Sequence, residues 1–281
     1  MKGWLRRLKP GLSNPPVFIR QADAVLSWSP RAGCSHAIFW AFLHEGVLDR
    51  AAAESPLPHR YRTFSYQREP RYHWDLLRVM TFGAPRRVLI RVTRDPKRRL
   101  VSIFRHCCRN AIVHAESRTR LGFDPSVEGF ALADLDRLLD GMVLTHPTTV
   151  DPHLMVQSNP LWDLPFGRTI TVNIDEVPLN ASLNAIEREL GLPVTAFETV
   201  PAFRKLRKSH NAKLSSFSGD GPIEAYRFGS KETKEFPVAE LLRSPLLERM
   251  SRTYYAADYG RVASGDTAGV LVQPSRKPTQ A

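Results

Sequence analysis

The sequence has few cysteines and no long apolar run. Only Cys34, Cys107 and Cys108 occur among 281 residues, and two of them are adjacent. This usage fits neither a disulfide framework nor a zinc site, and it favours a reducing compartment. No window approaches the ~20 apolar residues of a membrane-spanning helix. The basic start, residues 1–16, has no apolar core long enough for a signal peptide. We therefore expect a cytoplasmic protein.

The sequence also has fewer acidic than basic residues. The chain has 40 Lys and Arg residues against 28 Asp and Glu, which gives a formal net charge of +12. Such a charge favours anionic ligands or surfaces, among them acidic glycans, lipid headgroups and nucleic acid. Residues 1–12 are read either as a flexible basic tail or as a segment that lies weakly on a membrane surface.

The phosphate-binding pattern G-x-x-x-x-G-K-[ST] is missing, which removes the main support for an ordinary kinase or ATPase. A different anion loop is present. Ala24–Trp28 reads as a strand, Ser29–Ser35 as a tight loop, and the apolar stretch after it as a helix. Gly33 lets the backbone approach an anion closely, and N–H groups at the start of a helix cradle phosphate. Arg31 adds a fixed positive charge to this loop.

A second anion site is predicted where a short apolar run ends in Arg94. Asp95 suits an N-cap and Pro96 the first helical position. Arg99 and Ser102 are three residues apart, so they share a face of the helix that follows. Arg94 then lies at the carboxyl end of a strand, where open α/β sheets bind their ligands. A guanidinium, a hydroxyl and a helix N-terminus are together typical of a site for a phosphate-like anion.

Together the two loops resemble the sulfotransferases that use 3′-phosphoadenosine 5′-phosphosulfate (PAPS). Residues 30–35, PRAGCS, align with the loop P-K-x-G-[ST]-[ST] or P-K-x-A-C-T of that superfamily. Residues 94–104 match R-D-P-x-x-R-x-x-S-x-[FY] at every specified position. Residues 150–159, VDPHLMVQSN, are similar to the D-x-H-W-x-P-Q segment of the carbohydrate sulfotransferase branch, and residues 254–260 resemble its closing Y-x-x-D-Y segment.

The resemblance implies which residues bind the donor. The 3′-phosphate is expected at Arg94 and Ser102, and the 5′-phosphosulfate at the loop residues Arg31, Ala32, Gly33, Cys34 and Ser35. The family carries Lys at the position of Arg31. Arginine stabilises the charge on the leaving phosphate but does not readily give up a proton. The transfer is expected to need no metal.

The general base that takes the proton of the acceptor hydroxyl is left open between two histidines. His153 stands in the D-x-H segment, where Asp151 either orients its ring or caps the local turn. His73 precedes Arg94 by 21 positions, and the resemblance places it at the end of the preceding strand. The remaining candidates are Glu45 and Glu69 for the base and His36 for contact with the sulfate.

The alternation of strands and helices predicts an α/β fold, with a central parallel β-sheet flanked by helices. The resemblance makes this a P-loop-like three-layer fold. We expect a lead-in over residues 1–21, one sulfotransferase domain over residues 22–262 and a disordered tail over residues 263–281. The predicted strands are 24–28, 62–66, 87–92 and 169–174, and the predicted helices are 36–45, 75–81, 96–109, 127–142, 181–190 and 238–250.

The sequence thus predicts a bacterial, cytoplasmic PAPS-dependent O-sulfotransferase. Its acceptor is expected to be a hydroxyl of a carbohydrate or glycoconjugate, and its partners are not expected to include nucleic acid. Two alternatives stay open. One is a nucleotide-binding phosphotransferase with a degenerate P-loop, which magnesium dependence and ATP binding would reveal. The other is a basic nucleic-acid-binding protein, which a steep salt dependence of binding would reveal. The identity of the acceptor and the oligomeric state do not follow from the sequence.

Overall fold

The computed structural model describes residues 14–145, 150–210, 213–214, 216–262 and 270–274. These residues cluster into two compact units, where the sequence predicted one domain over residues 22–262. Unit 1 takes in the described residues up to Arg94, together with Ser158–His210 and the last strand. Unit 2 takes in Asp95–Gln157 and the described residues of Asn211–Arg261. Each unit has its own hydrophobic core.

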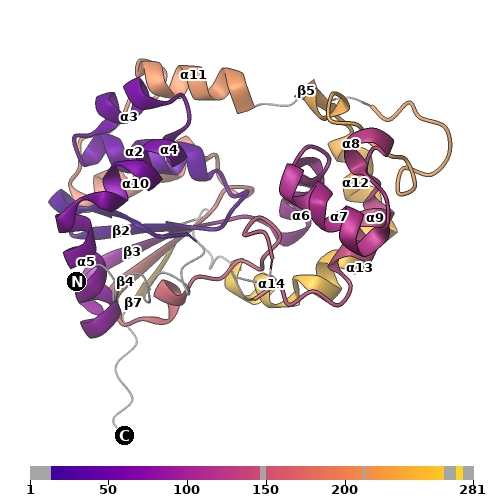
Figure 1. The fold of residues 1–281 in the computed structure, drawn as a ribbon. Helices are drawn as coiled ribbons and strands as arrows, with labels where there is room; N and C mark the ends of the chain where they lie inside the picture. Colours follow the sequence, from indigo (N-terminus) through magenta and orange to yellow (C-terminus); the bar gives the residue numbers. More distant parts are fainter. Residues whose placement is uncertain (1–13, 146–149, 211–212, 215, 263–269, 275–281) are drawn as a thin grey trace, which may run out of the picture. The chain divides into compact units, whose positions relative to one another are not determined.

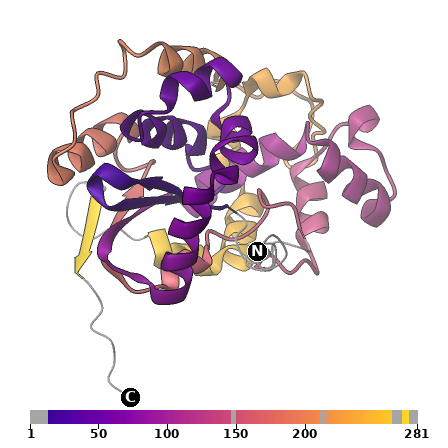
Figure 2. The ribbon, with the colours of Figure 1, turned by 60° about the vertical axis from the view of Figure 1, so that its left-hand side comes forward.

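Unit 1 is built on a mixed five-stranded sheet in the order β1-β2-β3-β4-β7. The three inner strands, β2 (Ala24–Trp28), β3 (Ala84–Thr93) and β4 (Phe166–Asn173), are parallel. The edge strands β1 (Val17–Ile19) and β7 (Val270–Pro274) run antiparallel to their neighbours. Figure 2 shows β7 as the yellow arrow at the border of the sheet.

The innermost parts of the sheet are buried under helices. All five residues of β2 are buried, as expected for a strand that is covered on both faces. The helices of unit 1 are α2 (Cys34–His44), α3 (Leu48–Glu54), α4 (Pro58–Phe64), α5 (Pro70–Phe82), α10 (Leu179–Leu190) and α11 (Pro201–His210), with short 3₁₀ turns at Arg20–Ala22, Tyr66–Arg68 and Pro160–Asp163. Figure 1 shows α2, α3, α4, α10 and α11 over one face of the sheet.

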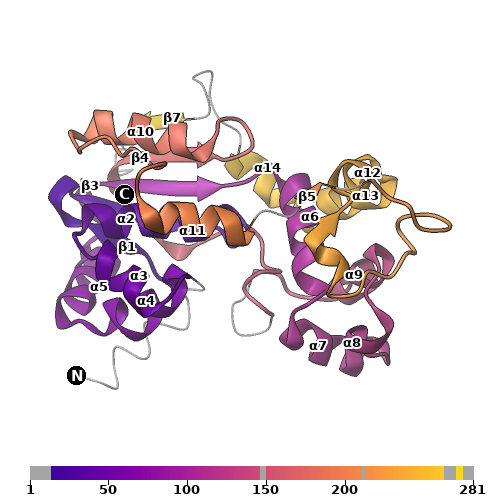
Figure 3. The ribbon, with the colours of Figure 1, turned by 90° about the horizontal axis from the view of Figure 1, so that it is seen from above.

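Unit 2 is mainly helical. Figure 3 shows α6, α9, α12 and α13 gathered in this unit. The hydrophobic core of unit 2 includes Leu100, Phe104, Leu135 and Met250 from these helices. Its elements are α6 (Pro96–Cys107), α7 (Ala111–Leu121), α8 (Pro125–Glu128), α9 (Leu132–Leu139), β5 (Lys213–Leu214), a 3₁₀ turn (Glu232–Lys234), β6 (Glu235–Phe236), α12 (Val238–Arg243), α13 (Pro245–Tyr254) and α14 (Ala256–Val262).

The predicted α/β class is confirmed, since helices flank a sheet whose inner strands are parallel. Three predicted elements are wrong in detail. Residues 62–66, predicted as a strand, belong to α4 and the turn after it. The helix predicted over residues 127–142 is interrupted at Gly129, whose φ of 75° no helix allows. The helix predicted over residues 238–250 is two helices, because Pro245 starts the second one behind the N-cap Ser244.

The predicted lead-in and tail fall largely outside the described residues. Residues 1–13 of the lead-in are not among them, whereas residues 17–19 form β1. Of the tail predicted as disordered, residues 263–269 and 275–281 lie outside, and residues 270–274 form β7 instead. Among the helices of the described chain, none is both long and apolar enough to cross a membrane.

Candidate functional site

The first anion loop follows the carboxyl end of β2, as predicted. Arg31 and Gly33 both have left-handed backbones, with φ of 70° and 71°. A Cβ atom on Gly33 would lie 3.0 Å from Cδ2 of Leu179, so glycine is needed there for conformation and for space. The loop closes through an N–H···O bond of 3.2 Å from Ala32 to Ser29. It delivers the chain into α2. The first N–H groups of a helix have no intrahelical acceptor, and such an arrangement suits an anion.

The carboxyl ends of the three parallel strands meet at this loop. The Ser29 N–H donates to the carbonyl of Val92 at 2.9 Å, and the Ile174 N–H donates to the carbonyl of Thr93 at 3.2 Å. Arg94, the residue after β3, therefore comes next to the loop. Its Nη1 lies 3.5 Å from the carbonyl oxygen of Arg31. Two residues that the sequence assigned to separate phosphate sites, Arg31 and Arg94, thus lie side by side in unit 1.

Arg94 also has an acidic partner that the sequence did not predict. Its Nε lies 3.2 Å from Oδ2 of Asp175, in the turn after β4. The positive charge of Arg94 is therefore partly balanced by a carboxylate. A phosphate that binds Arg94 has to share the guanidinium with Asp175 or displace it. Ser102, predicted to bind the same phosphate, belongs to α6 of unit 2, so its convergence with Arg94 stays a prediction.

Two residues of α4 complete the surroundings of the loop, and sequence reasoning missed both. The Nε2 atom of His59 lies 3.1 Å from Oγ of Ser35 and 3.5 Å from Sγ of Cys34. One helical turn on, Arg62 is buried, with its guanidinium 5.1 Å above the ring of Trp28, the last residue of β2. The sequence held two signals for this helix. Pro58 suits a first helical position, and the spacing of three residues between His59 and Arg62 puts both on one helix face.

Arg62 is a buried cation that has no carboxylate partner among the described residues. Its Nη1 donates to the carbonyl of Pro15 at 3.1 Å, while Nε has no acceptor within the described chain. Burial lowers the pKa of this guanidinium from its ordinary value. A buried charge without a counter-ion is costly. An anion bound beside Arg62 would offset that cost.

The predicted position of His73 is wrong. His73 lies inside α5 and not at the end of a strand. Its ring packs edge-on against Tyr72, and Asp75, two residues on, pairs with Arg20 and Arg87. The other candidate bases are in structural positions as well. Glu45 follows the C-terminus of α2, at the end of the helix opposite the anion loop, and pairs with Arg20, whereas Glu69 is the N-cap residue of α5.

The D-x-H segment of unit 2 forms a carboxylate–imidazole pair. Oδ1 of Asp151 accepts hydrogen bonds of 2.7 Å from both Nδ1 and the backbone N–H of His153. The side chain of Asp151 is 5% exposed and that of His153 is 39% exposed. Burial alone would raise the pKa of Asp151, but the two hydrogen bonds from His153 outweigh it and hold that pKa below its ordinary value. Asp151 therefore orients the ring, and it also caps the turn.

Buried residues from two other segments hold this pair in place. The Nη2 atom of Arg99 donates to the carbonyl of Met155 at 2.6 Å, and Tyr255 Oη donates to the carbonyl of Leu154 at 2.8 Å. Asp258 accepts the N–H of Gln157 at 2.7 Å and lies 3.6 Å from Nη1 of Arg99. Arg99 of the second motif thus holds the segment that carries His153. Three segments singled out in the sequence come together within unit 2.

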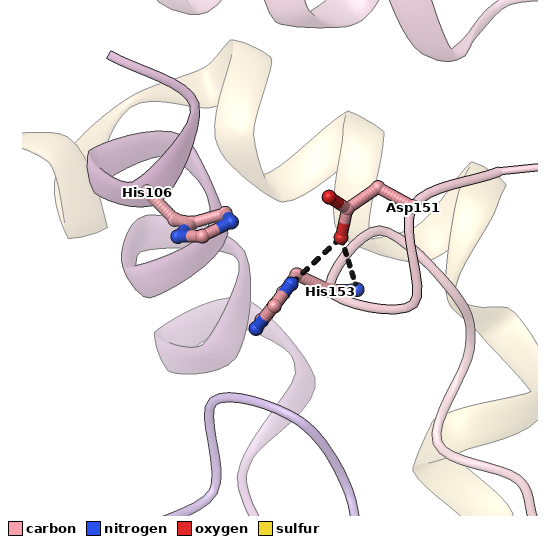
Figure 4. A group of neighbouring side chains, drawn as sticks. All are labelled: His106, Asp151 and His153. Atoms are coloured by element: carbon pink, nitrogen blue, oxygen red, sulfur yellow. Dashed lines mark hydrogen bonds and ion pairs between the residues drawn. The ribbon is translucent and has the colours of Figure 1, made fainter. Parts of the chain in front are cut away.

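One group of side chains has the composition of a metal site. His106 of α6, Asp151 and His153 each offer a ligand atom, and these atoms lie within 4.8 Å of one another. Figure 4 shows the ring of His106 and the carboxylate of Asp151 on either side of the ring of His153. The two imidazole centroids are 4.1 Å apart. The sequence did not predict a metal, because these residues do not have the spacing of a known metal motif.

His36, predicted to touch the sulfate, faces aromatic side chains instead. Its ring centroid lies 4.7 Å from that of Phe203 and 5.2 Å from that of Phe197. Burial lowers the pKa of His36 to about 4, and a hydrogen bond with Asn180 opposes this shift only in part. The folded state therefore holds the neutral imidazole.

We predict an acid-dependent loss of stability from His36. Because its folded-state pKa of about 4 lies below the unfolded value of about 6.5, stability is full above pH 6.5 and falls as the pH drops towards 4. The loss approaches about 3 kcal/mol. Urea unfolding of wild type and of His36→Gln should diverge over this range, with the variant showing the weaker pH dependence. Parallel curves would contradict the assignment.

Comparison of the chain with protein-family models, with curated proteins and with solved structures finds no match to any of them.

Proposed function

We propose that the protein is a PAPS-dependent O-sulfotransferase with a P-loop-like fold, acting on a hydroxyl of a carbohydrate or glycoconjugate in the bacterial cytoplasm. The observation that carries this proposal is the anion loop of unit 1. A glycine-dependent turn opens α2 at the carboxyl edge of parallel strands, next to Arg94 and beside the buried Arg62. Without a Walker lysine, such a loop suits a polyanionic nucleotide more than it suits ATP hydrolysis.

In this proposal the donor is held by charge and by backbone dipoles. The 5′-phosphosulfate lies at the start of α2 against Arg31 and the residues up to Ser35. His59 holds the hydroxyl of Ser35 through its Nε2 contact at 3.1 Å. Arg31 and Arg62 supply positive charge where negative charge grows on the leaving phosphate. Arg94 binds the 3′-phosphate, and the resemblance assigns Ser102 of unit 2 to the same phosphate.

The acceptor is activated by His153. Its Nδ1 proton is donated to Asp151, so the neutral ring keeps a lone pair on Nε2. The acceptor hydroxyl gives its proton to Nε2 while its oxygen attacks sulfur. The bond from sulfur to the bridging oxygen breaks, and 3′,5′-adenosine diphosphate leaves. The products are a sulfate ester and an imidazolium that Asp151 stabilises.

The donor assignment predicts a specific loss on Arg94→Ala. The charge-assisted contact with the 3′-phosphate is worth about 1.5–3 kcal/mol, so the Kd for 3′,5′-adenosine diphosphate should rise about 10- to 150-fold. Arg98→Ala is the matched control, because it removes the same charge from an exposed position of the same motif. Isothermal titration calorimetry measures both. Equal losses in the two variants would contradict a direct contact from Arg94.

The activity itself is tested by sulfate transfer. Wild-type protein, ³⁵S-labelled PAPS and a panel of bacterial glycans should give labelled, hydroxyl-linked product without added magnesium. Replacement of PAPS by γ-labelled ATP with magnesium tests the phosphotransferase alternative in the same panel. Labelling from ATP alone would overturn the sulfotransferase proposal.

A further inference from the structure

We propose that His106, Asp151 and His153 form a binding site for a zinc-like divalent cation, and that occupation of this site switches off His153 as a base. The first part stands on the geometry of unit 2 alone. The second part rests on the proposed function. Both parts use the same three side chains, which Figure 4 shows converging from α6 and from the segment of residues 151–153.

The donor set selects the class of ion. Two imidazole nitrogens and one carboxylate oxygen are the ligands of open zinc sites, in which water or another group takes the fourth position. Hard cations such as Mg²⁺ and Ca²⁺ prefer all-oxygen sites. With bonds of about 2.0–2.2 Å, a tetrahedral ion sets its donor atoms roughly 3.3 Å apart. The donor atoms here lie within 4.8 Å of one another, so small side-chain rotations bring them onto one ion.

Neighbouring groups hold the three side chains in place. His106 is carried by α6, and the side-chain amide nitrogen of Asn110 lies 2.5 Å from its Nε2. Asp151 and His153 are held by the buried contacts of Arg99 and Tyr255 to the carbonyls of Met155 and Leu154. The side chain of His153 is 39% exposed, which leaves the ion a route of entry and an open coordination position. Preorganised ligands lower the entropy cost of binding.

Binding of an ion changes the tautomer of His153. In the present arrangement the ring proton is on Nδ1, where it is donated to Asp151 at 2.7 Å. An ion between Asp151 and His153 takes the Nδ1 lone pair, so the proton of the neutral ring moves to Nε2. Nε2 is then a donor and can no longer accept the proton of a hydroxyl. The ion therefore inhibits transfer without closing the donor site.

Direct titration tests the site. Untagged, chelator-treated protein is titrated with ZnCl₂ by calorimetry and with CoCl₂ by visible absorption. We expect one saturable site, with the intense visible bands of tetrahedral cobalt. His106→Phe keeps a ring against His153 and removes the ligand nitrogens, so it should weaken binding at least tenfold. His59→Ala, which removes a histidine from unit 1, should leave binding unchanged.

Transfer assays test the consequence. Zinc at saturating concentration should abolish sulfate transfer by wild type, and His106→Phe should keep its metal-free activity and resist zinc. Zinc inhibition that is equal in wild type and His106→Phe would overturn the switch. Absence of saturable binding, or binding unchanged in His106→Phe, would overturn the site. Metal binding with no sulfate transfer under any condition would overturn the proposed function and leave the site standing.

Discussion

Replacement of His153 by alanine is expected to lower kcat by about 10²–10⁴-fold, the usual contribution of a positioned general base. The affinity for 3′,5′-adenosine diphosphate should stay nearly unchanged, because in the proposed mechanism His153 acts on the acceptor hydroxyl and not on the donor nucleotide. Asp151→Asn should also lower kcat strongly, since it weakens the 2.7 Å contact that fixes the tautomer of the ring. Steady-state kinetics on a verified acceptor measures both effects.

His73→Ala is the control for this prediction. His73 lies within α5, so its removal should leave kcat close to that of wild type. A large loss in His73→Ala together with full activity in His153→Ala would reverse the assignment of the base. If both variants keep full activity, the histidine mechanism is wrong, and Glu45 and Glu69 become the residues to test.

Arg31→Ala is expected to give the second large effect. Loss of a group that stabilises charge in the transition state costs about 10²–10³-fold in kcat. Binding of 3′,5′-adenosine diphosphate should change far less, because Arg94 and the 3′-phosphate supply most of the affinity. Arg31→Lys restores the residue typical of the family that the sequence resembles, and it should keep much of the activity. Arg, Ala and Lys all carry a Cβ atom, so the left-handed φ of 70° at this position disfavours all three alike.

Turnover and the affinity for 3′,5′-adenosine diphosphate, measured separately, distinguish a catalytic role of Arg31 from a binding role. A variant Arg31→Ala with full turnover would rule out the clamp on the 5′-phosphosulfate. A variant that loses nucleotide binding while kcat stays unchanged would show that Arg31 binds the ground state and the transition state equally. Arg62→Met offers a comparison at the second cation, whose guanidinium lies over Trp28.

The sequence predicted the strands and the loops at their ends better than it predicted the helices around them. Ala24–Trp28 was correct to the residue, because a fully buried strand is a short apolar run bounded by polar turns. Residues 62–66 were misread because Phe64, Ser65 and Tyr66 alternate aromatic and polar side chains, which is the period of a strand. In the structure Tyr61 and Tyr66 both pack on Phe42. Tertiary packing on α2 overrides the local pattern there.

At the candidate site, too, the sequence revealed local features but not the contacts between residues far apart in the chain. Arg31, Gly33 and Arg94 could be found because each stands beside a strand end, which local patterns reveal. The pairing of Arg94 with Asp175 joins residues 81 positions apart, and the contact of His59 with Ser35 joins residues 24 apart. Such contacts depend on which strands are neighbours and on how a helix packs. The sequence did not predict the buried hydrogen bond from Arg99 to the carbonyl of Met155 for the same reason.

The central claim is that the chain binds a 3′-phosphorylated adenine nucleotide through Arg94 and the loop before α2, and a thermal shift assay tests it most directly. A ligand at about 100 times its Kd stabilises the folded state by about 2.7 kcal/mol, which raises the melting temperature by about 5 °C. We predict such a shift with 3′,5′-adenosine diphosphate and a far smaller one with AMP at the same concentration. Equal shifts from the two nucleotides, or no shift from either, would contradict the account.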